Sequence, residues 1–173
     1  QGDKIMIKLG TMVRFSHETQ GLGELKTAFE NVKKYGLPTC QLCCWDMSKF
    51  TDENAAGIRE IVKETGVEIS ALWCGWEVTP TWDFIDGYHT IGLVPIAYRA
   101  RRVQNLKDGS DFAKKIGVKY VATHVGFLPE NQKTDEYTAV VEAIREVALH
   151  CKENGQYFLF ETGQETPVTL RRT

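Results

Sequence analysis

The feature that most constrains the fold is a short cassette that occurs four times: the end of a helical stretch, a glycine, and an apolar run. In chain order it reads KKYGLPTCQL, KETGVEISAL, KKIGVKYVAT and KENGQYFLF. Glycine readily adopts the left-handed conformation that ends many helices, and apolar runs of this length are typical of buried strands. The cassette therefore predicts a chain in which helices and strands alternate.

Five apolar runs have the length and the residue types of strands. They are KIMIKLG (4–10), TCQLCCW (39–45), EISALWC (68–74), KYVATHV (119–125) and YFLFE (157–161). Several are apolar at successive positions, which is typical of parallel strands that are covered on both faces. The long interval after the third run holds an insertion, residues 76–95.

The stretches between these runs have the apolar period of helices. The clearest stripe is formed by Val140, Ile144, Val147 and Cys151. The segments TDEN (51–54) and TDEY (134–137) each offer a threonine N-cap followed by acidic residues. The predicted glycine stops are Gly36, Gly66, Gly117 and Gly155.

This β–α repeat predicts an α/β fold with parallel strands and right-handed crossovers. An open doubly wound sheet and a (β/α)8 TIM barrel both fit. No G-x-G-x-x-G follows the first run, no G-x-x-x-x-G-K-[ST] occurs, and the lone G-x-G in QGLGEL (20–25) predicts only a loop before a helix. We therefore expect a barrel, of which about five β/α units lie in this chain.

Length and charge narrow the functional classes. The chain has 173 residues, which suits one domain, and a net charge of −2, which gives no basic footprint for nucleic acid. Three arginines, Arg99, Arg101 and Arg102, are expected to form a solvated helix face. No run is long enough to span a membrane and no signal peptide is visible.

Cysteine usage indicates a reducing compartment. The chain has five cysteines, and Cys40 and Cys43 form one C-x-x-C with no second pair at zinc-site spacing. The pair lies in an apolar run and not at a helix start, so we expect buried, reduced core thiols and a cytoplasmic location.

Candidate chemistry lies at the carboxyl ends of the strands, where α/β folds bind their ligands. His124 and Glu161 end the fourth and fifth runs, and Asp46 follows the second. His124 fits both a core histidine and a ligand contact, and Asp46 both a helix cap and a functional acid. Trp45, Trp73 and Trp76 fit both a core and the floor of a site. Glu161 points to function, because a carboxylate at the end of a buried strand is costly unless it is paired or bound to a metal.

The segments ATHVGFLPE and FLFETGQE resemble the fourth and fifth strand ends of the xylose isomerase-like TIM barrels, the sugar phosphate isomerase/epimerase superfamily. The resemblance implies that Glu161 is a catalytic residue and one of four ligands of a divalent cation, Mg, Mn, Co or Zn. It implies that His124 contacts the substrate, as in the isomerases, or a further metal, as in the endonucleases. Glu165 lies near the position of a substrate-contacting glutamate, although its offset is shorter than the usual one.

The same resemblance implies a sugar isomerase or epimerase that stabilises an enediolate during proton transfer. Trp45 and Trp76 would pack on the sugar, and the insertion with Trp82, Tyr88 and His89 would act as a lid. We expect a small-molecule sugar as partner, neither nucleic acid nor membrane, and leave self-association into a homo-oligomer open.

Two alternatives remain. One is an AP endonuclease of the endonuclease IV type, which has the same fold but uses more histidines than the four found here. The other is an incomplete barrel that binds no metal, because the sequence ends at PVTLRRT, before the strands that supply three of the family's four ligands. We expect residues 1–173 to be a single domain, the N-terminal portion of such a barrel, with strands 1–5.

Overall fold

One parallel sheet organises the protein. The computed structural model describes residues 7–16 and 21–173. The strands are β1 (Gly10–Arg14), β2 (Thr39–Cys44), β3 (Glu68–Cys74), β4 (Tyr120–His124) and β5 (Tyr157–Glu161). They pair in the order β1-β2-β3-β4-β5, and every neighbouring pair is parallel. The predicted α/β fold with sequential strands is confirmed.

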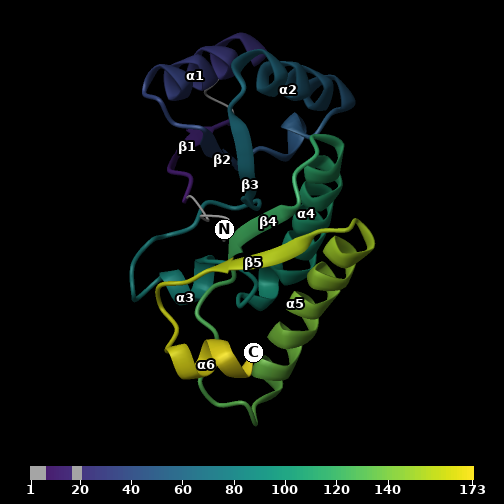
Figure 1. The fold of residues 1–173 in the computed structure, drawn as a ribbon. Coiled ribbons are helices and arrows are strands. Elements are labelled where there is room, and N and C mark those ends of the chain that lie inside the picture. Colours follow the sequence, from purple (N-terminus) through teal and green to yellow (C-terminus); the bar gives the residue numbers. More distant parts are fainter. Residues whose placement is uncertain (1–6, 17–20) are drawn as a thin grey trace, which may run out of the picture.

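Each strand is followed by at least one helix. The long helices are α1 (Leu22–Lys34), α2 (Asp52–Thr65), α4 (Ile96–Lys115) and α5 (Asp135–Glu153). Figure 1 shows these helices following one another in chain order as an arc outside the sheet. The shorter elements are the 3-10 helix η1 (Met47–Lys49), α3 (Gly87–Thr90) within the insertion, and α6 (Pro167–Arg172) after β5.

The helix ends have the predicted chemistry. The side chain of Thr51 accepts a hydrogen bond from the Asn54 backbone N–H, and that of Thr134 accepts one from Tyr137. All four predicted glycine stops have φ between +71° and +78°. L-residues with a side chain rarely adopt this conformation, so glycine is the natural residue at these stops.

The two faces of the sheet have different environments. Val13, Leu42 and Val121 lie in the main hydrophobic core, together with the apolar stripes of the helices. The opposite face carries Cys43 and Trp73 in a second, smaller cluster. In a barrel this second face is the interior, so the smaller cluster lies beside the expected site.

The position of β1 differs from the prediction. Of the predicted run 4–10, residues 4–6 lie outside the described residues, and the strand begins only at Gly10. Val13 and Phe15 are buried under the helices, whereas alternate positions face the interior and include the polar Arg14. Because buried and polar positions alternate in β1, it has fewer apolar residues than the run 4–10. The prediction therefore placed the strand too early in the sequence.

The prediction that β5 is a buried strand is also wrong. Tyr157 is 64% exposed and Leu159 is 40% exposed, and both lie on the interior face. β5 is the last strand of the sheet, so no further strand among the described residues covers this edge. Glu161 is itself exposed, and the desolvation argument for a metal at this carboxylate does not hold for this chain.

The expected solvated face of α4 is wrong for Arg102, which is fully buried. Arg99 is partly buried and donates hydrogen bonds to the carbonyls of Leu93 and Val94. Only Arg101 is well exposed, with a side-chain exposure of 71%. The cluster of three arginines in the sequence therefore gave no indication that Arg102 is an interior residue.

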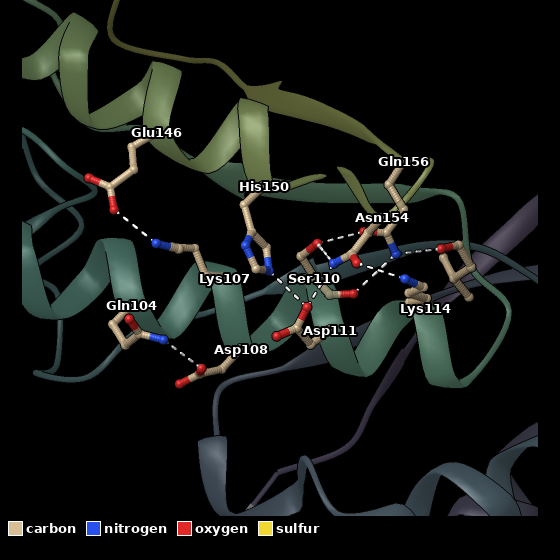
Figure 2. Close-up of polar contacts among 11 residues, drawn as sticks. Gln104, Lys107, Asp108, Ser110, Asp111, Lys114, Glu146, His150, Asn154 and Gln156 are labelled. Carbon is tan, nitrogen blue, oxygen red and sulfur yellow. Dashed lines mark hydrogen bonds and ion pairs between the residues drawn. The ribbon is translucent and has the colours of Figure 1, made fainter. Parts of the chain in front are cut away.

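Polar contacts join α4 to α5 (Figure 2). Asp111 accepts hydrogen bonds from Asn154 at 2.7 Å and from His150 at 2.8 Å. Ser110 donates to the buried amide oxygen of Gln156 at 2.6 Å. These contacts hold α4 and α5 against each other. The two helices connect β3 to β4 and β4 to β5.

No helix in the described part of the chain is long and apolar enough to cross a membrane. The five cysteines are free and buried, as predicted. Burial raises the pKa of Cys40 and of Cys44 to about 12, so both are protonated, unreactive thiols at neutral pH.

We expect Cys40, Cys44 and Cys74 to resist alkylation in the folded protein at pH 8, because all three are buried and their pKa values are raised. Unfolding should expose all five cysteines to the reagent. Mass spectrometry of peptides alkylated before and after addition of denaturant measures this. Rapid labelling of Cys40 in the folded protein would contradict the buried strand.

A second prediction concerns Asp111 and acid. Burial would raise the pKa of Asp111, but the hydrogen bonds from Asn154 and His150 outweigh it and hold the pKa below the ordinary 3.8. The carboxylate therefore stabilises the fold above pH 4, and this contribution is lost as the pH falls through its folded pKa. Asp111→Asn should reduce the free energy of unfolding by less than about 1 kcal/mol at pH 7, because the pair is partly solvated. Urea unfolding should show a larger difference at pH 7 than at pH 2.5, because the carboxylate becomes protonated as the pH falls.

Candidate functional site

The carboxyl ends of the strands form one rim, and a cleft of about 1150 Å³ opens there. Its lining comes from the ends of β1, β2, β3 and β5 and from the start of the insertion. The residues that define its character are Arg14, Trp45, Trp73, Trp76, Trp82 and Glu161. The lining also includes Asp46 and Glu77, so the cleft combines indoles with one arginine and three carboxylates.

Three indoles make the floor. The ring centroids of Trp45 lie 4.8 Å from those of Trp73 and 5.1 Å from those of Trp76. Trp73 and Trp76 are almost fully buried. Gly75 allows this packing, because a Cβ at that position would lie 2.6 Å from the Trp45 ring. The sequence left open whether these tryptophans form a core or the floor of a site. They do both, because they pack together as core residues and also line the cleft.

Glu161 is held against this floor. The Trp73 Nε1–H donates a 2.6 Å hydrogen bond to Glu161 Oε2. The bond joins the ends of β3 and β5, two strands that are not neighbours in the sheet. The carboxylate is therefore oriented by an indole and remains open to the cleft.

His124 is the register partner of Glu161 in the β4–β5 pair. Its Nδ1 accepts a hydrogen bond from the Gly126 backbone N–H at 3.1 Å, so in the neutral ring the proton is on Nε2. Nε2 is buried and has no hydrogen-bond partner among the described residues. The sequence alternative of a satisfied core histidine does not hold, because one ring nitrogen is an unused donor.

The other predicted residues lie apart from this pair. Asp46 is buried and caps η1 by accepting hydrogen bonds from the backbone and hydroxyl of Ser48. Glu165 accepts a hydrogen bond from the Gly163 N–H in the loop after β5. His89 is exposed on α3 and packs edge-on against Tyr88. Of the predicted residues, Asp46 lines the cleft, whereas His124, Glu165 and His89 do not.

Sequence reasoning missed Arg14. It is the last residue of β1 and lies on the rim beside Cys43, its register partner. Burial raises the pKa of the Cys43 thiol, and the positive charge of Arg14 opposes this by a smaller amount. Correct placement of β1 would have found Arg14, because the last residue of a parallel strand lies at the rim where ligands bind.

Residues 29–173 match the family described as the xylose isomerase-like TIM barrel. The chain belongs to this family. No curated protein sequence matches the chain significantly.

Several solved structures are similar to this chain. A xylose isomerase domain protein from Planctomyces limnophilus has 27% identity and a TM-score of 0.82 over 95% of this chain and 56% of its own. A D-allulose 3-epimerase from Methylomonas sp. has 11% identity and a TM-score of 0.66 over 95% of this chain and 58% of its own. A D-psicose 3-epimerase from Clostridium cellulolyticum H10 has 15% identity and a TM-score of 0.60 over 96% of this chain and 60% of its own.

The chain therefore spans somewhat more than half the length of these proteins. At the lower identities the similarity shows the fold alone. Within the described residues, no group of three or more His, Cys, Asp or Glu side chains is placed to hold a metal ion. Glu161 and its neighbours do not by themselves form a metal centre.

We expect Gly75→Ala to reduce the free energy of unfolding by about 1–3 kcal/mol, because the new methyl group overlaps the Trp45 ring. The near-ultraviolet circular dichroism of the indoles should change with it. Gly23→Ala is the matched control: it lies in α1 with no atom within 4 Å of the added Cβ. That variant should be stabilised by roughly 0.5–1 kcal/mol. Equal effects of the two substitutions would show that Trp45 does not pack on Gly75.

Proposed function

We propose that the complete barrel is a ketose isomerase or epimerase, which moves a proton to or from a carbon beside a carbonyl group. The observation that carries the proposal is the Trp73–Glu161 hydrogen bond. It sets a carboxylate against an indole floor, next to an unused histidine donor. Family membership supports the proposal.

The proton transfer follows from these groups. The Glu161 carboxylate takes the proton from the carbon, the C–H bond breaks, and its electron pair moves toward the carbonyl oxygen. His124 Nε2–H, buried and without a hydrogen-bond partner among the described residues, is the donor that stabilises the developing negative charge on that oxygen. For the isomer, Glu161 returns the proton to the former carbonyl carbon, while the proton of the neighbouring hydroxyl passes to the former carbonyl oxygen. For the epimer, a second acid on the opposite face protonates the original carbon, and Glu161 keeps the proton that it took.

The indoles favour a sugar over other small molecules. A sugar ring or chain presents C–H groups on one side and hydroxyl groups on the other. Trp45 and Trp76 offer apolar ring faces to the C–H side of the sugar. Arg14 and Glu161 line the same cleft and offer hydrogen-bonding groups to its hydroxyl groups. An AP endonuclease is less well supported, because among the described residues the cleft lining has three carboxylates and a single arginine, which is no cluster of cations for phosphates.

The family resemblance implies a divalent cation that binds the carbonyl and hydroxyl oxygens. The resemblance assigns Glu161 to such a site, and the described residues supply no group of three or more His, Cys, Asp or Glu side chains there. The remaining ligands would have to come from outside the described residues. We therefore expect the 173-residue chain to bind divalent cations weakly.

Glu161→Gln tests the proposal. In a protein with the complete barrel, it should reduce turnover of ketoses at least ~10²-fold, because the amide is not a base. The metal content should also fall, since one charged ligand is removed. A panel of pentuloses and hexuloses, with elemental analysis of the purified protein, measures both.

Glu68→Gln is the matched control, because Glu68 begins β3 at the far end of the sheet and pairs with Lys8 on the surface. Its turnover and metal content should equal those of the unsubstituted protein. If Glu161→Gln also retained full turnover and metal content, the carboxylate would be structural and the proposal wrong.

A further inference from the structure

Arg102 is a buried cation without an anionic partner. Its side chain is fully buried on α4, and no carboxylate pairs with it among residues 7–16 and 21–173. Burial lowers its pKa to about 10, so it remains charged at neutral pH. A buried guanidinium is costly unless its N–H groups donate hydrogen bonds. The groups that accept these hydrogen bonds therefore indicate the role of Arg102.

Those partners are backbone carbonyls of the insertion (residues 76–95). Nε donates to the Glu77 carbonyl at 3.2 Å and Nη2 to the Val78 carbonyl at 3.3 Å. Nη1 donates to the Gly92 carbonyl at 2.8 Å. One planar guanidinium therefore joins the beginning of the insertion to its end.

The faces of the same guanidinium contact two aromatic rings. It lies 5.2 Å from the Trp76 ring and 4.9 Å from the Tyr98 ring. Trp76 packs in turn on Trp45 in the floor of the cleft. Arg102 therefore contacts one of the three indoles of the cleft floor, and that indole also contacts Trp45.

Neighbouring side chains of α4 act on the same segment. Asn105 Oδ1 accepts a hydrogen bond from the Glu77 N–H at 3.1 Å, and Arg101 forms an ion pair with the Glu77 carboxylate. The far end of the insertion is fixed where Leu93 N–H donates to the Val125 carbonyl at 2.8 Å. The insertion is therefore anchored at both ends, with Arg102 between them.

The anchored conformation is strained at Val78. Its φ is +72°, which a β-branched residue adopts only when its surroundings impose it. Val78 lines the cleft and is 46% exposed, so burial of its side chain does not account for the strain. The Val78 carbonyl is one of the three that accept hydrogen bonds from Arg102.

We propose that Arg102 is a positioning residue for sugar binding, which fixes Trp76, Glu77 and Val78 as one wall of the cleft. It contacts neither the sugar nor the reacting carbon. This inference rests on the proposed function. Glu161 and His124 are fixed at the ends of β5 and β4, although Trp82 of the insertion packs edge-on against the His124 ring. The hydrogen bonds of Arg102 go to Glu77, Val78 and Gly92, so its loss should weaken sugar binding more than it slows the proton transfer.

The test is Arg102→Met in the complete barrel, with the ketose that the unsubstituted protein converts. We expect KM to rise about tenfold or more with kcat changed by less than about threefold, the pattern of lost uniform binding. Arg102→Lys keeps the charge but not the planar fork, and should give an intermediate KM. Arg59→Met, which removes an exposed arginine of α2 that donates to the Lys115 carbonyl, should leave both constants unchanged.

A second measurement is independent of turnover. Acrylamide quenching of tryptophan fluorescence should increase in Arg102→Met and in Arg102→Lys, at temperatures where both are folded, and not in Arg59→Met. If the unsubstituted barrel converts no ketose, the proposed function fails while this measurement still tests the wall. Unchanged KM and quenching in Arg102→Lys, with only a lower unfolding temperature, would overturn the proposal and leave Arg102 a structural residue. If Arg102→Met does not fold, Arg102→Lys decides by the same criteria.

Discussion

Parallel pairing of neighbouring strands is the constraint on which the rest of this structure depends. It requires a helical crossover between each strand and the next, and it brings all five carboxyl ends to one rim. The register then decides which side chains meet there. His124 and Glu161 are opposite one another in the β4–β5 pair, although 37 residues separate them in the sequence.

Much of this arrangement could be predicted from local chemistry. The glycine stops, the threonine caps and the apolar stripes each depend on a few consecutive residues, so their predictions are correct. The exposure of β5 could not be predicted this way. YFLF has the composition of a buried strand, but its burial depends on whether another strand lies beside it.

The candidate site was only partly predictable for the same reason. Residues at the ends of strands, such as His124 and Glu161, follow from the strand boundaries. Arg14 was missed because the boundary of β1 was wrong by several residues. The Trp73–Glu161 hydrogen bond crosses the sheet between strands that are not neighbours, and no sequence pattern indicates such a contact. Arg102 was misjudged because a cluster of three arginines is usually solvated, whereas here the insertion covers one of them.

The sequential strand order also bears on how such a chain folds during synthesis. Each strand pairs with the one made immediately before it, so a nascent chain can add one strand and one helix at a time to a sheet that already exists. Ribosomes add roughly 5–20 residues per second, and a unit of this size therefore emerges within seconds. At every stage the newest strand has an unpaired edge and uncovered interior side chains, as Tyr157 and Leu159 do on β5. The exposed apolar surface of a nascent chain would therefore lie at that advancing edge, and each new β/α unit would cover it.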